Sequence, residues 1–230
     1  MLEQELHWER GLFFALNGSD SVFWDQFFWL YSSKWTWIPF YLCFLFVFIY
    51  KKHWKEILCI LLAVTLVILI GDQLVSGFFK PFFHRFRPTH HPDFYEQVRT
   101  VFDYRGGKYG FISGHAANSF AFATFTSLLF RSRWFTGTIL LFAVLNAYSR
   151  IYLGVHFISD VAAGTLVGIL VGYGIYLLYA FARQKWIFND CSESERPSYS
   201  KQEIRFLCMA YFVMLAILLL FNNQLVGLFH

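Results

Sequence analysis

Long apolar stretches with few charges constrain the fold of this chain more than any other feature. They lie at about residues 35–50, 57–79, 115–131, 134–153, 157–182 and 205–223. Each is close to the roughly 20 residues that a helix needs to cross the hydrocarbon core of a bilayer. Because 57% of the residues are hydrophobic and only 15% are charged, an ordinary soluble domain is excluded. The sequence predicts an all-α, integral membrane bundle of six transmembrane helices.

The rest of the chain fits around this bundle as one membrane domain, residues 1–230. Its N-terminal part is rich in aromatic side chains but broken by polar residues and a turn at Asn17-Gly18, which predicts amphipathic helices along the membrane interface. The predicted divisions are interfacial helices at 1–31, core helices that carry the polar motifs at 35–182, a cytoplasmic linker at 183–204 and a C-terminal transmembrane helix at 205–223.

Charge and cysteine usage favour a lipid partner and exclude several other classes. The net charge is only +4 and the cations form no stripe, so nucleic-acid binding has little support. Cys43, Cys59 and Cys208 lie in apolar stretches, so we expect neither a disulfide framework nor a zinc site. Residues 1–10 lack the pattern of a signal peptide, and insertion is expected to use the membrane segments themselves. The oligomeric state stays open.

The polar intervals should alternate between the two membrane faces. Residues 51–55, 131–133 and 183–205 fall on one side; residues 80–114, the turn near Gly154 and both termini fall on the other. The two sides carry 10 and 9 Lys and Arg residues, and setting aside Lys80, Arg87 and Arg150, which have a chemical reason for their positions, leaves 10 against 6. Positively charged short loops stay in the cytoplasm, so the second side is predicted to face outward.

Gly164, Gly168 and Gly172 repeat every four residues within one apolar stretch. Such a stripe lets a neighbouring backbone approach closely. Packing inside the bundle is favoured over dimerisation.

His156 and Asp160 form the first candidate catalytic pair. Four residues apart at the start of a helix, they share one face, so the carboxylate can accept a hydrogen bond from one ring nitrogen and leave the other as a nucleophile. The alternative is a pair that bonds only to itself and to water. Arg150 lies just across the turn Leu153-Gly154, and ionisable groups at membrane depth are functional by default, which favours the catalytic interpretation.

Ser113, Gly114 and His115 stand immediately before the helix that begins near Ala116. Backbone N–H groups at a helix N-terminus favour phosphate oxygens, and Gly114 lets the backbone come close. His115 is then placed to protonate a leaving group as general acid. Ser113 could equally be an N-cap, and the two roles are compatible.

Lys80, Arg87 and Arg150 supply three positive charges. An isolated pair such as Lys80 and Arg87 would usually snorkel to the interface. Together with Arg150, however, they match what a phosphoryl group in transfer needs. The cations would do what magnesium does elsewhere, so we expect no metal and no other cofactor. The other titratable residues of the loop have no interpretable spacing and are expected to be solvated, with a headgroup contact as the alternative for Arg85, His90 and His91.

These residues resemble the three signatures of the type 2 phosphatidic acid phosphatase family. Lys80, Arg87 and Pro88 match the first, and Ser149, Arg150, His156 and Asp160 match the third. The second is normally Pro-Ser-Gly-His and here reads Ile112-Ser113-Gly114-His115. The resemblance covers roughly residues 19–182.

The resemblance implies hydrolysis through a phosphohistidine at His156, held by Asp160, with His115 as acid. Lys80, Arg87, Ser113, Gly114 and Arg150 would surround the phosphoryl oxygens. The implied substrates are undecaprenyl diphosphate, phosphatidylglycerol phosphate, phosphatidic acid or a lipid A phosphate. The short chain without long loops favours a bacterial envelope lipid, and with the charge bias it predicts a bacterial inner membrane with the site facing the periplasm. A phosphotransferase between lipids and a non-catalytic transporter of anionic lipid are the alternatives.

Overall fold

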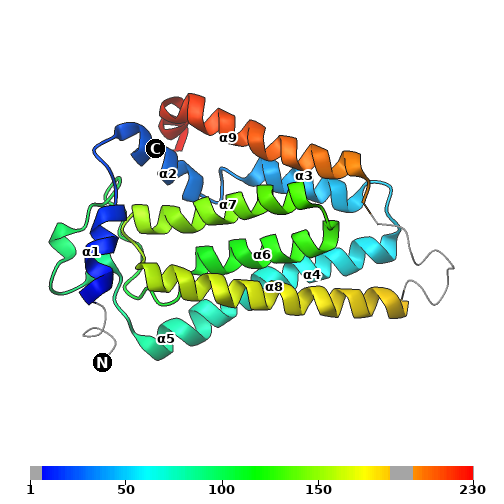
Figure 1. Ribbon diagram of the computed structural model, residues 1–230, viewed down its shortest axis with the longest axis horizontal. Helices are drawn as coiled ribbons and strands as arrows, with labels where there is room; N and C mark the ends of the chain where they lie inside the picture. The colour runs from blue at the N-terminus through cyan, green and yellow to red at the C-terminus, as the bar shows by residue number, and fades with distance from the viewer. Residues whose placement is uncertain (1–6, 187–198, 230) are drawn as a thin grey trace.

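All regular secondary-structure elements of the described residues are helices (Figure 1). A computed structural model describes residues 7–186 and 199–229. The α-helices are α1 His7–Leu16, α2 Val22–Ser32, α3 Ile38–Ile49, α4 Trp54–Asp72, α5 Lys80–Phe83, α6 Gly114–Phe130, α7 Arg133–Tyr152, α8 Ile158–Trp186 and α9 Lys201–Phe229, with a π-helix η1 at Gln73–Phe79 and 3-10 turns η2 at Pro88–His90 and η3 at Tyr95–Gln97. The all-α prediction is confirmed for these residues.

Three stretches of helix are long and apolar enough to cross a membrane: Trp54–Phe83, Ile158–Trp186 and Lys201–Gly227. The other three predicted spans are also helices, but α3 has 12 residues, α6 has 17, and α7, with 20, carries Asn146, Ser149 and Arg150 among its buried residues. Their large exposed apolar side chains, such as Leu42, Phe46 and Val144, suit lipid contact. The protein is therefore a membrane protein.

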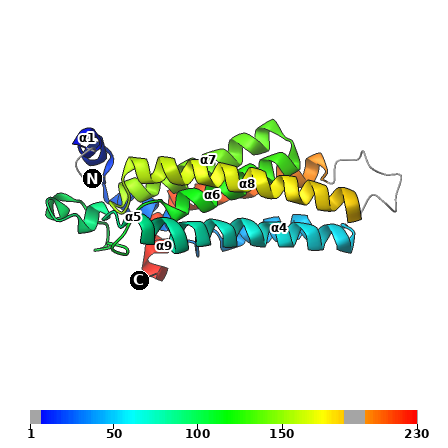
Figure 2. The same ribbon diagram turned by 90° about the horizontal axis from the view of Figure 1, so that it is seen from below.

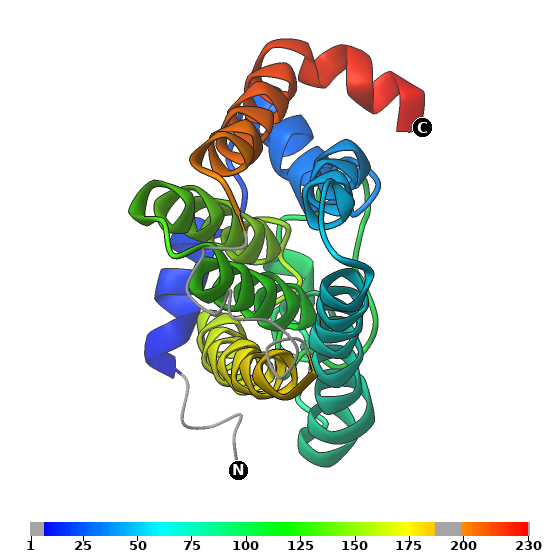
Figure 3. The same ribbon diagram turned by 90° about the vertical axis from the view of Figure 1, so that its right-hand side faces the viewer.

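Helix α6 lies at the centre of the bundle. It packs against α8, α7 and α4, while α9 lies across α2, α3 and α7 on the outer side (Figures 1 and 3). The interior between these layers is dominated by aromatic rings, with Trp37, Tyr31 and Tyr211 fully buried. Burial of such large rings stabilises the outer layer as well as the centre.

The glycine stripe of α8 packs inside the bundle, as predicted, and it does so against α6. The two helices run side by side in Figure 2. A Cβ atom added to Gly168 would lie 2.3 Å from the carbonyl oxygen of Ala117, and one added to Gly172 would lie 2.3 Å from that of Ala121. Both distances are too short for any side chain. The two helices therefore touch backbone to backbone.

The N-terminal helices are present with the predicted break between them. Gly18 at Asn17-Gly18 has φ +72°, and α2 buries Phe27, Leu30 and Tyr31 against the bundle while Val22 and Trp24 are exposed. The apolar ridge of α2 meets α9 and α7, which gives these side chains more cover than the interface would.

The predicted linker at 183–204 contributes helix at both of its ends. Helix α8 continues to Trp186 because Arg183 Nε donates to Glu56 Oε2 at 2.9 Å, which ties this last turn to α4. Helix α9 begins at Lys201. Residues 187–198 lie outside the described residues.

The polar motifs gather at one end of the bundle. Helix α1, helix α5, the loop 84–113 and the turn between α7 and α8 share that end, whereas the turns after α3 and α6 lie at the other (Figure 1). This is the grouping of loops that the sequence predicts.

Candidate active site

The loop after α5 turns back on itself to present two arginines. The N–H of Arg87 donates to Lys108 O at 3.1 Å, the N–H of Gly110 donates to Arg85 O at 2.9 Å, and Phe86 and Tyr109 form an antiparallel bridge between them. In extended backbone, residues two apart point to the same side. Arg85 and Arg87 therefore both reach the start of α8.

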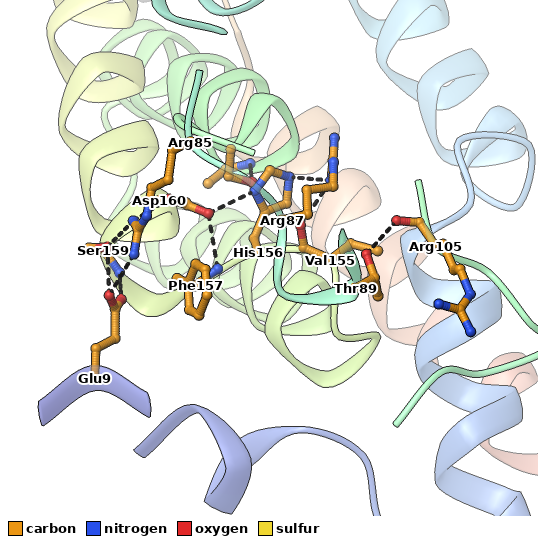
Figure 4. A network of polar contacts seen from close by, with 12 residues as sticks. Glu9, Arg85, Arg87, Thr89, Arg105, Val155, His156, Phe157, Ser159 and Asp160 are labelled. Carbon is orange, nitrogen blue, oxygen red and sulfur yellow. Dashed lines mark hydrogen bonds and ion pairs between the residues drawn. The ribbon is translucent and has the colours of Figure 1, made fainter. Parts of the chain in front are cut away.

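His156 is held between a carboxylate and a guanidinium (Figure 4). Its Nδ1 lies 3.4 Å from Asp160 Oδ2, which also accepts the backbone N–H of Phe157 at 3.0 Å. Its Nε2 lies 3.0 Å from Arg87 Nη1, which also donates to Val155 O at 2.9 Å. Because a guanidinium can only donate, Nε2 is the acceptor and Nδ1 carries the proton that faces Asp160.

The environment keeps His156 neutral. Burial lowers the pKa of His156 well below its ordinary value, and the charges of Arg87, Arg150 and Lys80 lower it further. Burial and the nearby Arg150 also lower the pKa of Arg87, to about 10, so Arg87 stays charged at neutral pH. A neutral imidazole among cations can act as a nucleophile toward an anionic ligand.

Two buried arginines keep unused donors at this place. Arg150 is 3% exposed, and its Nη2 donates to the hydroxyl of Tyr104 at 3.2 Å. Within the described ranges, Nε of Arg150 and Nε of Arg87 have no hydrogen-bond partner. A buried cation with unused donors is costly unless an anion completes it.

Lys80 is a third cation close to this group. It follows the π-helix Gln73–Phe79 and lies within electrostatic range of Arg87, Arg150 and Asp160. The wider π-helical turn rotates the residues beyond it relative to a regular α-helix, and such turns are frequent at functional sites. The sequence did not predict it.

The start of α6 brings the remaining predicted residues. Ser113 is the N-cap, and its Oγ accepts the N–H of Ala116 at 3.5 Å, while its own N–H donates to Asp160 O at 2.9 Å. Backbone donors for an anion must therefore come from Gly114 and His115. The His115 ring is exposed and lies within electrostatic range of Arg150, Arg87 and His156.

All eight predicted residues thus lie at one end of the bundle, and two further charged residues join them. Arg85, expected to be solvated, is instead 6% exposed and forms ion pairs with Asp160 Oδ1 at 2.6 Å and Glu9 Oε2 at 2.9 Å. That expectation was wrong. The two-residue spacing from Arg87 was the available signal for Arg85; nothing in the sequence indicated Glu9.

A glycine missed by the sequence analysis closes the site. A Cβ atom on Gly110 would lie 3.1 Å from Asp160 Oδ2 and 3.1 Å from Arg87 Cγ. A side chain there would press on both partners of His156.

Comparisons with known proteins identify the family of this chain. The sequence profile of the PAP2 superfamily matches residues 62–184. The chain is 47% identical to the lipid A 4'-phosphatase of Porphyromonas gingivalis over 97% of this chain and 95% of that protein, and 40% identical to the lipid A 4'-phosphatase of Bacteroides thetaiotaomicron over 75% of each. The crystal structure of Aquifex aeolicus LpxE superposes with a TM-score of 0.54 at 31% identity, covering 74% of this chain and 94% of that one. The chain belongs to the PAP2 superfamily and is a lipid phosphatase.

Proposed function

We propose that this protein removes the 4'-phosphate of lipid A through a phosphohistidine at His156. The geometry that supports this most directly is the His156 ring, fixed between Asp160 and Arg87 with a proton on Nδ1 and a lone pair on Nε2. The relatives support the substrate, because the similarity to a lipid A 4'-phosphatase extends over nearly the whole chain.

In the first step the phosphate displaces the arginine from the nucleophile. Its oxygens accept from Arg87, Arg150 and Lys80, so Arg87 Nη1 turns from His156 Nε2 to the substrate. The Nε2 lone pair then forms a bond to phosphorus while the bond to the sugar oxygen breaks. Asp160 stabilises the positive charge that develops on the imidazole.

His115 completes both halves of the reaction. As general acid it gives a proton to the departing sugar oxygen, which leaves as an alcohol. In the second half it takes a proton from a water molecule that attacks the phosphohistidine. Inorganic phosphate departs, and His156 and His115 return to their starting states.

The membrane arrangement follows from the same proposal. Six helices cross the bilayer, with α3, α6 and α7 completing the three longer spans, and the end that carries His156 faces the periplasm of a bacterial inner membrane. The charge bias of the short loops supports this orientation. The N-terminal helices cover the site at the membrane surface.

Phosphate release in detergent tests the proposal. Purified protein is given lipid A that carries both the 1- and the 4'-phosphate, and mass spectrometry with fragmentation identifies the phosphate that is lost, with His156→Ala as the control. We expect loss of the 4'-phosphate by the wild type alone.

Three other outcomes would contradict the proposal. A preference for phosphatidylglycerol phosphate, phosphatidic acid or undecaprenyl diphosphate would show that the substrate is not lipid A. Appearance of labelled phosphate on a second lipid would indicate a transferase. Binding of lipid A without phosphate release would indicate a transporter.

A further inference from the structure

We propose that Glu9 of helix α1 is a positioning residue for His156, acting through Arg85 and Asp160. The inference rests on the proposed function, because it concerns the nucleophile of that reaction. Glu9 is fully buried although it lies near the start of the described chain. It is 147 residues away from His156 in sequence, yet only two side chains separate them (Figure 4).

The carboxylate of Glu9 is completely engaged at the start of α8. Its Oε2 accepts from Arg85 Nη2 at 2.9 Å and from Ser159 Oγ at 3.0 Å, and its Oε1 accepts the backbone N–H of Ser159. The N-terminus of a long helix favours a negative charge. Glu9 therefore joins α1, the loop and α8 at one point.

Arg85 competes with His156 for Asp160. Arg85 Nη1 lies 2.6 Å from Asp160 Oδ1, whereas His156 Nδ1 lies 3.4 Å from Asp160 Oδ2. A guanidinium at that distance, left alone, would cancel most of the charge by which Asp160 stabilises an imidazolium. Glu9 compensates it, so the group formed by Glu9, Arg85 and Asp160 keeps one net negative charge facing His156.

Packing holds this group rigid. Phe13, one turn further along α1, is fully buried and its ring centroid lies 5.4 Å from that of Phe157. The Arg85 guanidinium lies 4.4 Å from the centre of the same Phe157 ring. Because the Phe157 ring and two carboxylates restrict the Arg85 guanidinium, it helps to fix the direction of the Asp160 oxygens.

The simpler role for Glu9 is structural, as an anchor of α1 on the helix terminus. The two roles differ in what the charge does. A structural anchor affects stability alone. A positioning charge also stabilises the protonated form of His156. Lys80, Arg87, Arg150 and His115 oppose that protonation.

Steady-state kinetics of phosphate release from lipid A in detergent separate these roles. For Glu9→Gln we expect kcat to fall about tenfold and KM to change less than about twofold. The acid limb of the pH profile of kcat/KM should move about 0.5 pH unit lower. An opposite charge in direct contact shifts the pKa of an ionisable group by about one unit or more, and a charge that acts through an intermediate group shifts it less. Glu9→Asp, which keeps the charge, should restore the acid limb.

Two controls complete the experiment. Glu96→Gln removes an exposed carboxylate and should change nothing, and Leu12→Ala removes an exposed apolar side chain of α1 without changing charge and should leave the acid limb in place. An unchanged kcat in Glu9→Gln, or a fall with an unmoved acid limb, overturns the inference. If Glu9→Gln does not fold, Arg85→Lys provides the test, because a lysine cannot bridge both carboxylates. A wild-type kcat in Arg85→Lys would then overturn the inference. A wild type that releases no phosphate instead refutes the proposed function.

Discussion

The contact between Arg87 and His156 determines which nitrogen acts. With Nε2 accepting from Arg87 and Nδ1 facing Asp160, the imidazole is in the tautomer that a nucleophile needs. In the proposed mechanism, His156 carries out the attack and His115 the proton transfer.

Substitution of the two histidines should separate these steps. His156→Ala is expected to abolish turnover, whereas His115→Ala should lower kcat by about 10² to 10⁴, the usual contribution of a general acid. Phosphate release in detergent measures both. His53→Ala, at the opposite end of the bundle, is the matched control and should retain activity. Turnover that survives His156→Ala would exclude the covalent route.

The pH profile should also report His156. Because the pKa of His156 is lowered, the ring stays neutral and active as the pH falls to about 6.5, the ordinary value for histidine, and activity is lost only at lower pH, where the ring takes up a proton. The basic limb of kcat, which reports the enzyme with substrate bound, follows loss of the proton from the general acid, because the phosphate anion in the site favours a protonated His115; the kcat profile should therefore be bell-shaped. A flat profile between about pH 5 and 9 would contradict this assignment.

Sequence spacing identified the site residues whose contact partners lie within the same motif. His156 and Asp160 lie one helical turn apart, so their contact follows from helix geometry. Glu9 and Arg85 could not be paired in the same way, because they are 76 residues apart and meet only when α1 docks. The burial of Arg85 is a property of that tertiary contact.

Among the elements, the seam between α6 and α8 sets the geometry of the site. Gly164, the first glycine of the stripe, lies against Ser113, since an added Cβ would be 2.5 Å from Ser113 O. The close approach of the two helices therefore brings the N-cap of α6 beside the first turn of α8. The stripe could be recognised from the sequence because a four-residue repeat is close to one helical turn and places the three glycines on one face of the helix.

A methyl group in this seam should destabilise the bundle. Gly168→Ala must displace the carbonyl of Ala117, and we expect a loss of about 1–3 kcal/mol, as for overpacked interiors. Thermal unfolding in detergent measures it. Gly174→Ala in the same helix is the control, because nothing lies within 4 Å of its Cβ position. Equal stability of the two variants would contradict the close contact.

The helix segments were predictable from apolar length, but their departures from regularity were not. The π-helix Gln73–Phe79 and the burial of α2 each depend on neighbours that hydropathy does not identify. Helix α8 exceeds its apolar stretch because a salt bridge, and not lipid, covers its last turn.

At the scale of the whole molecule, positive charge is concentrated by folding. Lys80 and Arg87 lie in one segment and Arg150 comes from α7, more than 60 residues later, and the bundle gathers all three at one end. The sequence-wide charge of +4 gives no indication of this concentration.

The gathered cations should make the enzyme independent of divalent metal. We expect phosphate release to change less than about twofold in EDTA, since the cations neutralise the charge that a bound metal would otherwise stabilise. The assay compares enzyme in EDTA with enzyme in added Mg²⁺. Activity that EDTA removes and Mg²⁺ restores would contradict this prediction.

The hydrogen bond from Arg87 to Nε2 has a consequence for selectivity. If His156 is the nucleophile, as proposed, its attacking lone pair is capped in the resting enzyme, and a ligand needs enough negative charge to draw the guanidinium away. Uncharged esters, which are abundant in a lipid bilayer, would leave the cap in place. The proposed mechanism therefore predicts that the anion of the substrate frees the imidazole and that the ester bonds of neighbouring lipids are not attacked.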